Sequence, residues 1–198
     1  MSEINIRDAK KSDAADLALL DNIAGHGISL WFWTSLTETN RYEDALSLGR
    51  DRLAADDAFY GWRNARLAVE DDMVLGMANS YIMPPPSTES DEMKEHSDAF
   101  KPVFDLYDSC AGEWFIDCLA VYPSAQGNGV GKLLFEDSMA TGEKSDAATM
   151  SLVVEDTNHG AAKLYRSYGF EVVDSREFIP FEGCVEINEW LLMRRDFA

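Results

Sequence analysis

A glycine-rich turn is the segment of the sequence with the clearest chemical meaning. Residues 126–131 read Gln-Gly-Asn-Gly-Val-Gly and stand between an apolar run and an amphipathic stretch. Glycines leave backbone N–H groups accessible, and the positive end of a following helix dipole adds to their field. Such a turn can hold an anionic group without any charged side chain. The segment therefore predicts a phosphate-binding site.

Three phosphate-binding motifs compete for this turn. A P-loop needs a glycine five residues before Gly131 and Ser or Thr after Lys132, but these positions hold Gln126 and Leu133. A dinucleotide fingerprint needs its third glycine at position 132, where the chain has lysine. The spacing that fits is Gln-x-x-Gly-x-Gly, from Gln126 to Gly131.

The turn needs a strand before it and a helix after it, and hydrophobic periodicity predicts both. The nearly continuous apolar run over 114–121 is typical of a central strand buried on both faces. A strand at 148–154 separates two amphipathic helices, 130–142 and 158–168. The second of these ends at Gly169, which is suited to a left-handed stop.

The other elements complete a mixed α/β sheet. Further strands are expected at 4–6, 65–70, 74–83, 170–173 and 185–193, and further helices at 12–24 and 41–55. The polar, acidic segment that follows the three prolines from Pro84 is typical of a flexible loop up to Lys101. We therefore expect a single domain over residues 1–198, with a flexible loop at 84–101.

Charge and composition narrow the classes of partner. The 198 residues include 17 Lys+Arg against 36 Asp+Glu, which gives a net charge of −19. This charge disfavours nucleic acid and anionic membranes as partners, and it is compatible either with a well-solvated surface or with attraction of a cationic substrate. The three cysteines and three histidines lack metal-ligand spacing, so we expect no metal. No signal peptide or apolar span stands out, which predicts a cytoplasmic protein.

Two motifs follow one another in the second half of the chain. The first is Leu119-Ala120-Val121-Tyr122-Pro123, followed by Gln126-x-x-Gly129-x-Gly131. The second is Asn158-x-x-Ala161-x-x-Leu164-Tyr165-x-x-x-Gly169-Phe170. Together they resemble the GNAT superfamily of acetyl-CoA-dependent N-acetyltransferases, and the region of Arg63-Asn64-Ala65 and Pro84 is similar to bacterial members of unassigned substrate. The resemblance implies an α/β (α+β) GNAT fold: a mixed, mostly antiparallel sheet of six to seven strands, splayed at a V-shaped wedge and flanked by about four helices.

The resemblance also implies a binding site for acetyl-CoA as co-substrate. Family members bind pantetheine along the strand that matches 114–121 and pyrophosphate on the glycine turn. Asn158 would hydrogen-bond the pantetheine, and Tyr165 would face the sulfur. The implied cofactor-binding residues are Leu119, Ala120, Val121, Gln126, Gly127, Asn128, Gly129, Val130, Gly131, Lys132, Asn158, Ala161 and Tyr165. Many members carry Arg or Lys inside the turn, where this chain has Gly127 and Asn128.

Acetyl transfer to an amine needs a base, an oxyanion donor such as the Leu119 N–H, and a proton for the departing thiolate. By motif position Tyr165 supplies that proton, although its helical spacing also describes a core aromatic residue. Asp117 and Glu113 share one strand face by alternation, and family members often place a basic carboxylate on this strand. For each, the alternative is a structural carboxylate bonded by its neighbours, and a water relay could take the place of either as base.

The acceptor pocket carries no motif of its own. Trp31, Trp33 and Tyr81 are the candidates for its wall, with core packing as the alternative. We expect an N-acetyltransferase that moves an acetyl group to a primary amine by direct attack, without an acyl-enzyme. The acceptor is expected to be a small amine or an amino-acid-like molecule. Alternatives are a CoA-binding regulatory module without catalysis, a peptide N-terminal acetyltransferase, or transfer of a longer acyl group. The resemblance also implies that the chain could form a homodimer, since many relatives pair as dimers.

Overall fold

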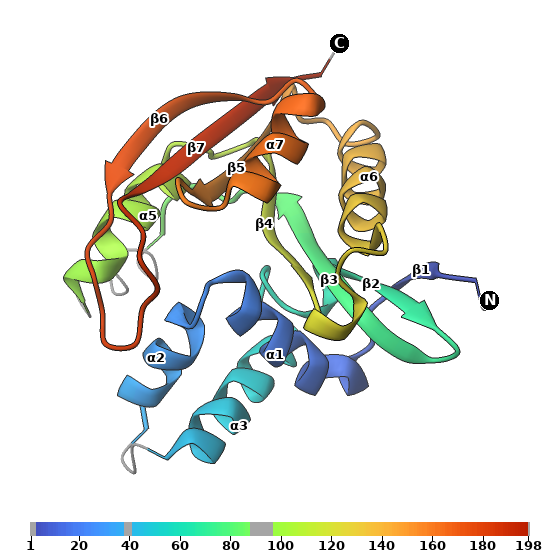
Figure 1. The fold of residues 1–198 in the computed structure, drawn as a ribbon, viewed down its shortest axis with the longest axis vertical. Coiled ribbons are helices and arrows are strands. Elements are labelled where there is room, and N and C mark those ends of the chain that lie inside the picture. The colour runs from blue at the N-terminus through green and yellow to red at the C-terminus, as the bar shows by residue number, and fades with distance from the viewer. Residues whose placement is uncertain (1–2, 38–40, 88–96, 198) are drawn as a thin grey trace. The chain divides into compact units, whose positions relative to one another are not determined.

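The computed structural model describes residues 3–37, 41–87 and 97–197. Within these ranges the chain forms seven β-strands and six α-helices (Figure 1). The strand order in the sheet is β1-β2-β3-β4-β5-β7-β6. The chain divides into two compact units. The first comprises Met1–Tyr81, Asp117–Thr141 and Glu182–Cys184, and the second comprises Ile82–Ile116, Gly142–Phe181 and Val185–Ala198.

An antiparallel ladder forms one side of the first unit. Its strands are β1 (Asn5–Asp8), β2 (Ala65–Glu70) and β3 (Met73–Ile82). Asp71 and Asp72 connect β2 to β3 with φ angles of 48° and 65°. Two-residue hairpins of this hand need positive φ at both central residues, and Asp tolerates that conformation better than most residues. These two aspartates therefore form a tight hairpin turn between the strands that the sequence predicts at 65–70 and 74–83.

Three helices pack together in the same unit: α1 (Ala14–Ala24), α2 (Ile28–Ser35) and α3 (Tyr42–Leu53) (Figure 1). The sequence pattern did not predict α2, because its residues are mostly apolar and show no hydrophobic stripe. A Cβ atom at Gly49 of α3 would clash with the ring of Trp33. Glycine at this position is what allows α2 and α3 to approach so closely.

Helix α6 (Val130–Gly142) covers the β2–β3 ladder. Val130 and Leu134 are buried in an apolar cluster with residues of both strands. The hydroxyl of Ser138 lies 2.8 Å from that of Ser80, a buried polar contact between helix and strand. Helix α6 is thereby fixed against the sheet along three of its turns.

The second unit contains three more strands and two helices. They are α5 (Lys101–Asp108), β5 (Thr149–Glu155), α7 (His159–Ser167), β6 (Glu171–Glu177) and β7 (Glu189–Asp196). β5 pairs antiparallel with β7, which pairs antiparallel with β6. β5 also pairs in parallel with β4 (Trp114–Val121), but only over Trp114–Ile116. α5 packs against β5, β6 and β7.

The predicted fold class, a mixed and mostly antiparallel sheet with flanking helices, is confirmed, with two corrections of detail. The last strand begins at Glu189 rather than Val185, because the carboxylate of Asp156 takes the amides of Asn188 and Glu189. The expected loop at 84–101 runs into α5, a helix that the pattern missed. Residues 88–96 of that loop lie outside the described residues. The single domain stays a prediction.

Candidate active site

The glycine turn is held in shape by its own side chains. Gly127 and Gly129 adopt φ angles of 79° and 80°, which other residues enter with strain. The side-chain amide of Gln126 donates to the Val121 carbonyl at 3.0 Å, and that of Asn128 donates to the Ala125 carbonyl at 3.3 Å. These two polar side chains therefore order the turn. The expected spacing of glycines is explained by the conformation they adopt.

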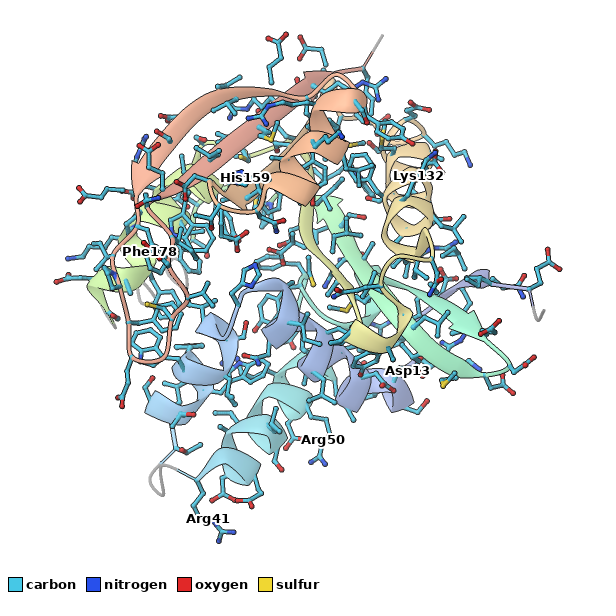
Figure 2. The ribbon with its side chains drawn as sticks, viewed as in Figure 1. Asp13, Arg41, Arg50, Lys132, His159 and Phe178 are labelled. Carbon is cyan, nitrogen blue, oxygen red and sulfur yellow. The ribbon has the colours of Figure 1, made fainter. Side chains whose placement is uncertain are left out.

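The amides of the turn have no acceptor within the part of the chain that the structure describes. In the described structure the first hydrogen bond of α6 runs from Leu133 N to Gly129 O at 3.0 Å. The amides of residues 126–132 donate in none of the hydrogen bonds among the described residues. Lys132, on the first turn of the helix, is exposed and its ammonium lies 3.8 Å from Glu136 (Figure 2). The turn thus presents free N–H groups at a helix N-terminus, which is an anion-binding arrangement.

In β4, the strand before the turn, buried and half-buried residues alternate from Asp117 onwards. Asp117, Leu119 and Val121 are half-buried, and they alternate with the buried Cys118 and Ala120. This alternation places the two predicted main-chain positions, Leu119 and Val121, on the same face as Asp117.

Tyr122 fixes the point where β4 passes into the turn. Its amide donates to Leu75 of β3 at 2.9 Å, and its hydroxyl donates to Asp16 of α1 at 2.7 Å. Burial, together with the bond to the Asp16 carboxylate, raises the pKa of the Tyr122 phenol well above its ordinary value. The phenol therefore stays protonated and acts as a donor that ties α1 to the entrance of the turn.

Glu113 is engaged in an ion pair. Arg194 Nε lies 2.9 Å from one carboxylate oxygen of Glu113 and 3.0 Å from the other. Arg194 also donates to the carbonyl of Ser109 at 2.8 Å. Glu113 precedes β4 instead of lying within it. This geometry matches the structural alternative given for Glu113 above.

Helix α7 begins with the cap that its sequence predicts. Asn158 Oδ1 accepts a hydrogen bond from the Ala161 amide at 3.3 Å. Asn158 Nδ2 takes no part in the hydrogen bonds among the described residues, so the side-chain amide keeps a donor for a ligand. Tyr165 lies further along α7. It is 7% exposed and packs against Phe170, with ring centroids 6.3 Å apart. His159 follows the cap and is exposed (Figure 2).

The three acceptor candidates have different surroundings within the first unit. Trp33 is 4% exposed and packs on Gly49, which is a core role. Tyr81 is buried edge-on against Phe59 at 5.1 Å between ring centroids. Trp31 is half-buried on α2.

Two acidic residues escaped the sequence reasoning. Asp21 of α1 bonds Ser29, and burial raises the pKa of its carboxyl. Glu155 ends β5 and is buried. A signal for Glu155 was present in the sequence: it is the first charge after an apolar strand, three residues ahead of Asn158.

Two other kinds of feature are absent from the described part of the chain. Residues 3–37, 41–87 and 97–197 contain no cluster of three or more His, Cys, Asp or Glu residues that could hold a metal ion. None of the helices described in these ranges is both long and apolar enough to cross a membrane.

Comparison with known proteins places this geometry in a family. The model of the acetyltransferase (GNAT) family matches residues 26–170. This match covers most of the chain, and the chain therefore belongs to the GNAT acetyltransferase family. The expectation of an N-acetyltransferase that depends on acetyl-CoA is confirmed at the level of the family. No curated protein matches the chain.

Solved structures agree on the fold. An acetyltransferase crystal structure is 21% identical, covers 97% of this chain and 98% of its own, and has a TM-score of 0.66. The structure of yncA from Salmonella typhimurium with its cofactor acetyl-CoA is 18% identical, with coverage of 98% and 94% and a TM-score of 0.59. Arabidopsis thaliana Naa50 in complex with the bisubstrate analogue CoA-Ac-MVNAL is 18% identical, with coverage of 98% and 99% and a TM-score of 0.58.

Proposed function

We propose that the protein transfers an acetyl group from acetyl-CoA to a primary amine by direct attack, without an acyl-enzyme. The observation that carries this proposal is the row of unused amides over residues 126–132 at the start of α6. Oriented backbone N–H groups and a helix dipole suit a pyrophosphate, and they do so although the turn contains no Arg or Lys before Lys132. The net charge of −19 does not describe this local field.

The remaining cofactor contacts follow the family motifs. Main-chain groups of Leu119 and Val121 would bond the pantetheine arm, and the donor left on Asn158 Nδ2 suits a pantetheine carbonyl. Ala161 supports this role indirectly, since its amide orients Asn158. Acetyl-CoA in yncA and the CoA conjugate in Naa50 support the same class of co-substrate.

The chemistry requires proton transfers that this chain can carry out. The amine nitrogen, once neutral, attacks the thioester carbonyl carbon, while the Leu119 N–H stabilises the oxyanion. The C–N bond forms and the C–S bond breaks. The departing thiolate takes the phenolic proton of Tyr165, and the phenolate recovers a proton from the acylated nitrogen. A general acid of this kind contributes about 10²–10⁴ in rate.

Two carboxylates near β4 were the candidates for the base. Glu113 is held by Arg194, whose guanidinium contacts both of its oxygens, so we assign it a structural role. Asp117 is half-buried on the face of Leu119 and Val121, and of the two it is the one placed to act on a substrate along β4.

The acceptor is proposed to be a small amine or amino-acid-like molecule. The net charge of −19 favours approach of a cation, because a substrate amine is protonated at neutral pH. A peptide N-terminus is the second candidate, supported by Naa50, whose bisubstrate analogue carries the peptide MVNAL.

A direct test is thiol release from acetyl-CoA in the presence of a panel of amines. The panel should contain polyamines, amino acid amides and short peptides with free N-termini. Amine-dependent release of CoA, with mass-spectrometric detection of the acetylated amine, is the expected result. Tight CoA binding by calorimetry without turnover on any amine would instead identify a CoA-binding module that has lost catalysis.

A further inference from the structure

Tyr122 is the residue at which β4 passes into the glycine turn, and each of its polar groups has a partner. Its amide donates to the Leu75 carbonyl of β3 at 2.9 Å, and its carbonyl accepts the Ala125 amide at 2.8 Å. Its hydroxyl donates to the carboxylate of Asp16 in α1 at 2.7 Å, across 106 positions of sequence. Any residue with a backbone amide could make the first two bonds, so the phenol bond calls for an explanation of its own.

Asp16 lies in the first turn of α1, and this end of the helix is firmly held. Ala14 and Leu17, on either side of Asp16 in the sequence, are buried. The guanidinium of Arg7 contacts both carboxylate oxygens of Asp13, the residue before the helix, at 2.7 and 3.1 Å. The carboxylate that accepts the phenol bond therefore belongs to an element whose position is set by core packing and by an ion pair.

The glycine turn itself is anchored to the apolar core at both of its ends. Ala125 before it and Val130 after it are buried in one cluster with residues of β2 and β3. Residues 126–129 between them are exposed. The Tyr122 phenol adds a fixed point on the side of α1, beside which the turn begins (Figure 1). Because the proposed pyrophosphate donors are backbone amides of this turn, a movement of its backbone displaces several of them together.

The hydrogen bond between Tyr122 and Asp16 is of a strong kind. Its acceptor is a carboxylate, and bonds to charged groups are stronger than bonds between neutral ones. Both side chains are half-buried, which reduces competition from water. Burial and the bond to Asp16 raise the pKa of the phenol, so the donor proton is present throughout the pH range of an acetyl-transfer assay.

We propose that Tyr122 is a positioning residue for the cofactor: its bond to Asp16 holds the glycine turn in the conformation that binds pyrophosphate, and so makes the enzyme selective for CoA thioesters over thioesters of pantetheine alone. This inference rests on the proposed function and concerns its acetyl donor. Leu119 and Val121, the proposed pantetheine contacts, offer main-chain groups of β4, and the backbone bond from Tyr122 to Leu75 holds that strand without the phenol. The two parts of the cofactor therefore depend on the phenol to different extents.

The decisive variant is Tyr122→Phe, which keeps the ring and the backbone bonds and removes the hydroxyl. Two acetyl donors are compared with the same amine: acetyl-CoA and S-acetylpantetheine, which lacks the pyrophosphate and the nucleotide. We expect Tyr122→Phe to lower kcat/KM for acetyl-CoA about tenfold through KM, with kcat at saturation within about twofold of wild type. For S-acetylpantetheine, kcat/KM should stay within about twofold. Calorimetry should show a Kd for CoA that is about tenfold higher.

Variants of Asp16 test the same bond from its other side. Asp16→Asn keeps an oxygen that can accept the phenol bond, and its Kd for CoA should stay within about threefold of wild type. Asp16→Ala removes the acceptor and should weaken CoA binding as much as Tyr122→Phe does. The double variant Asp16→Ala/Tyr122→Phe should bind CoA no more weakly than either single variant, because the same bond is lost in all three.

Tyr60→Phe is the matched control. The hydroxyl of Tyr60 accepts a hydrogen bond from the Arg52 guanidinium at 3.1 Å, in the same unit of the fold. Its loss removes a phenol contact with a charged group but leaves the bond between Tyr122 and Asp16 in place. Tyr60→Phe should therefore retain the wild-type Kd for CoA and the wild-type kcat/KM for both thioesters. Urea unfolding reports whether each variant is folded and how much stability it has lost.

Three results would overturn the proposal. They are equal losses of kcat/KM for the two thioesters in Tyr122→Phe, an unchanged Kd for CoA in that variant, or additive effects of Tyr122→Phe and Asp16→Ala. Failure of the proposed function itself looks different, because wild-type protein would then bind CoA and release no thiol with any amine. The calorimetric comparison of Tyr122→Phe with Tyr60→Phe would still decide the role of the phenol in that case.

Discussion

The glycine turn and the end of β5 differ in exposure and in the groups that they present. The turn is exposed, carries no charge inside residues 126–131 and offers backbone amides only. Glu155 at the end of β5 faces Trp190 of β7, and both are buried, the one with a carboxylate and the other with an indole N–H. An anion of several charges is held well by many small dipoles, whereas removal of one proton needs a single titratable atom at a fixed place. Binding at the turn should therefore depend on backbone geometry, whereas the role of Glu155 and Trp190 should depend on single side-chain atoms.

The largest effect should come from the phenol of Tyr165. Tyr165→Phe removes the proposed proton donor and should lower kcat by about 10²-fold or more, with KM for acetyl-CoA little changed. Tyr168→Phe, three residues further along the chain, is the matched control and should retain activity. Steady-state kinetics on both variants make the comparison, and full turnover by Tyr165→Phe would leave Tyr165 a core aromatic residue.

The turn should respond to a methyl group that forces its backbone to change. Gly129→Ala places a side chain at φ 80°, at a cost of about 1–2 kcal/mol, and should raise the Kd for CoA about tenfold. Gly112→Ala is the matched control. It has the same backbone strain at φ 82° and open space around it, but it lies in the turn before β4. Both variants should lose similar stability in urea unfolding. Calorimetry should show weakened CoA binding in Gly129→Ala alone.

Glu113 should matter for stability and not for catalysis. Glu113→Gln breaks the ion pair with Arg194 and should lower the free energy of unfolding by about 1–2 kcal/mol, because both groups are mostly shielded from solvent. Asp51→Asn, in the exposed pair with Arg50, should have an effect below about 0.5 kcal/mol. Urea unfolding measures both, and kcat of Glu113→Gln should equal that of wild type. A large fall in kcat would instead support Glu113 as the general base.

The smallest effect is local and depends on pH. Bonds donated by the side chain of Asn188, with backbone amides of Asn188 and Glu189, lower the pKa of Asp156 below its ordinary value. Because the pKa of Asp156 is lower in the folded state, the ionised carboxylate and its hydrogen bonds stabilise the fold at neutral pH. This stabilisation is lost as the pH falls below the ordinary pKa of Asp and through the lowered pKa.

Hydrogen exchange at the amides of Asn188 and Glu189 is the measurement. Protection should be high at pH 7, should fall below pH 4 after correction for the intrinsic rate, and should already be low at pH 7 in Asp156→Ala. Unchanged exchange would show that the carboxylate does not hold this strand end.

Local patterns allowed much of the cofactor side to be predicted. The glycine spacing requires positive φ at 127 and 129, and both are found. Asn158 was placed at the start of a helix, and it caps that helix through Ala161. The strand before the turn and the helix after it were also found where periodicity placed them. These features depend on residues within a few positions of one another.

Two kinds of feature could not be predicted in this way. α2 was missed because its mostly apolar sequence has no helical stripe, and its packing depends on Gly49 of another helix. The partner of Glu113 is Arg194, 81 positions away, and alternation alone left the role of Glu113 open. In both cases the deciding contact is made by a distant segment.

The sequence by itself determined the conformation of the glycine turn and the family, because glycine conformations, helix caps and hydrogen bonds between near neighbours are set locally. Only the tertiary structure decided which polar side chains are buried and which of them meet. Glu155 and Trp190 are 35 positions apart, and the antiparallel register of β5 and β7 sets them opposite each other. Register and burial depend on how whole elements pack, and a carboxylate in the sequence carries no mark of either.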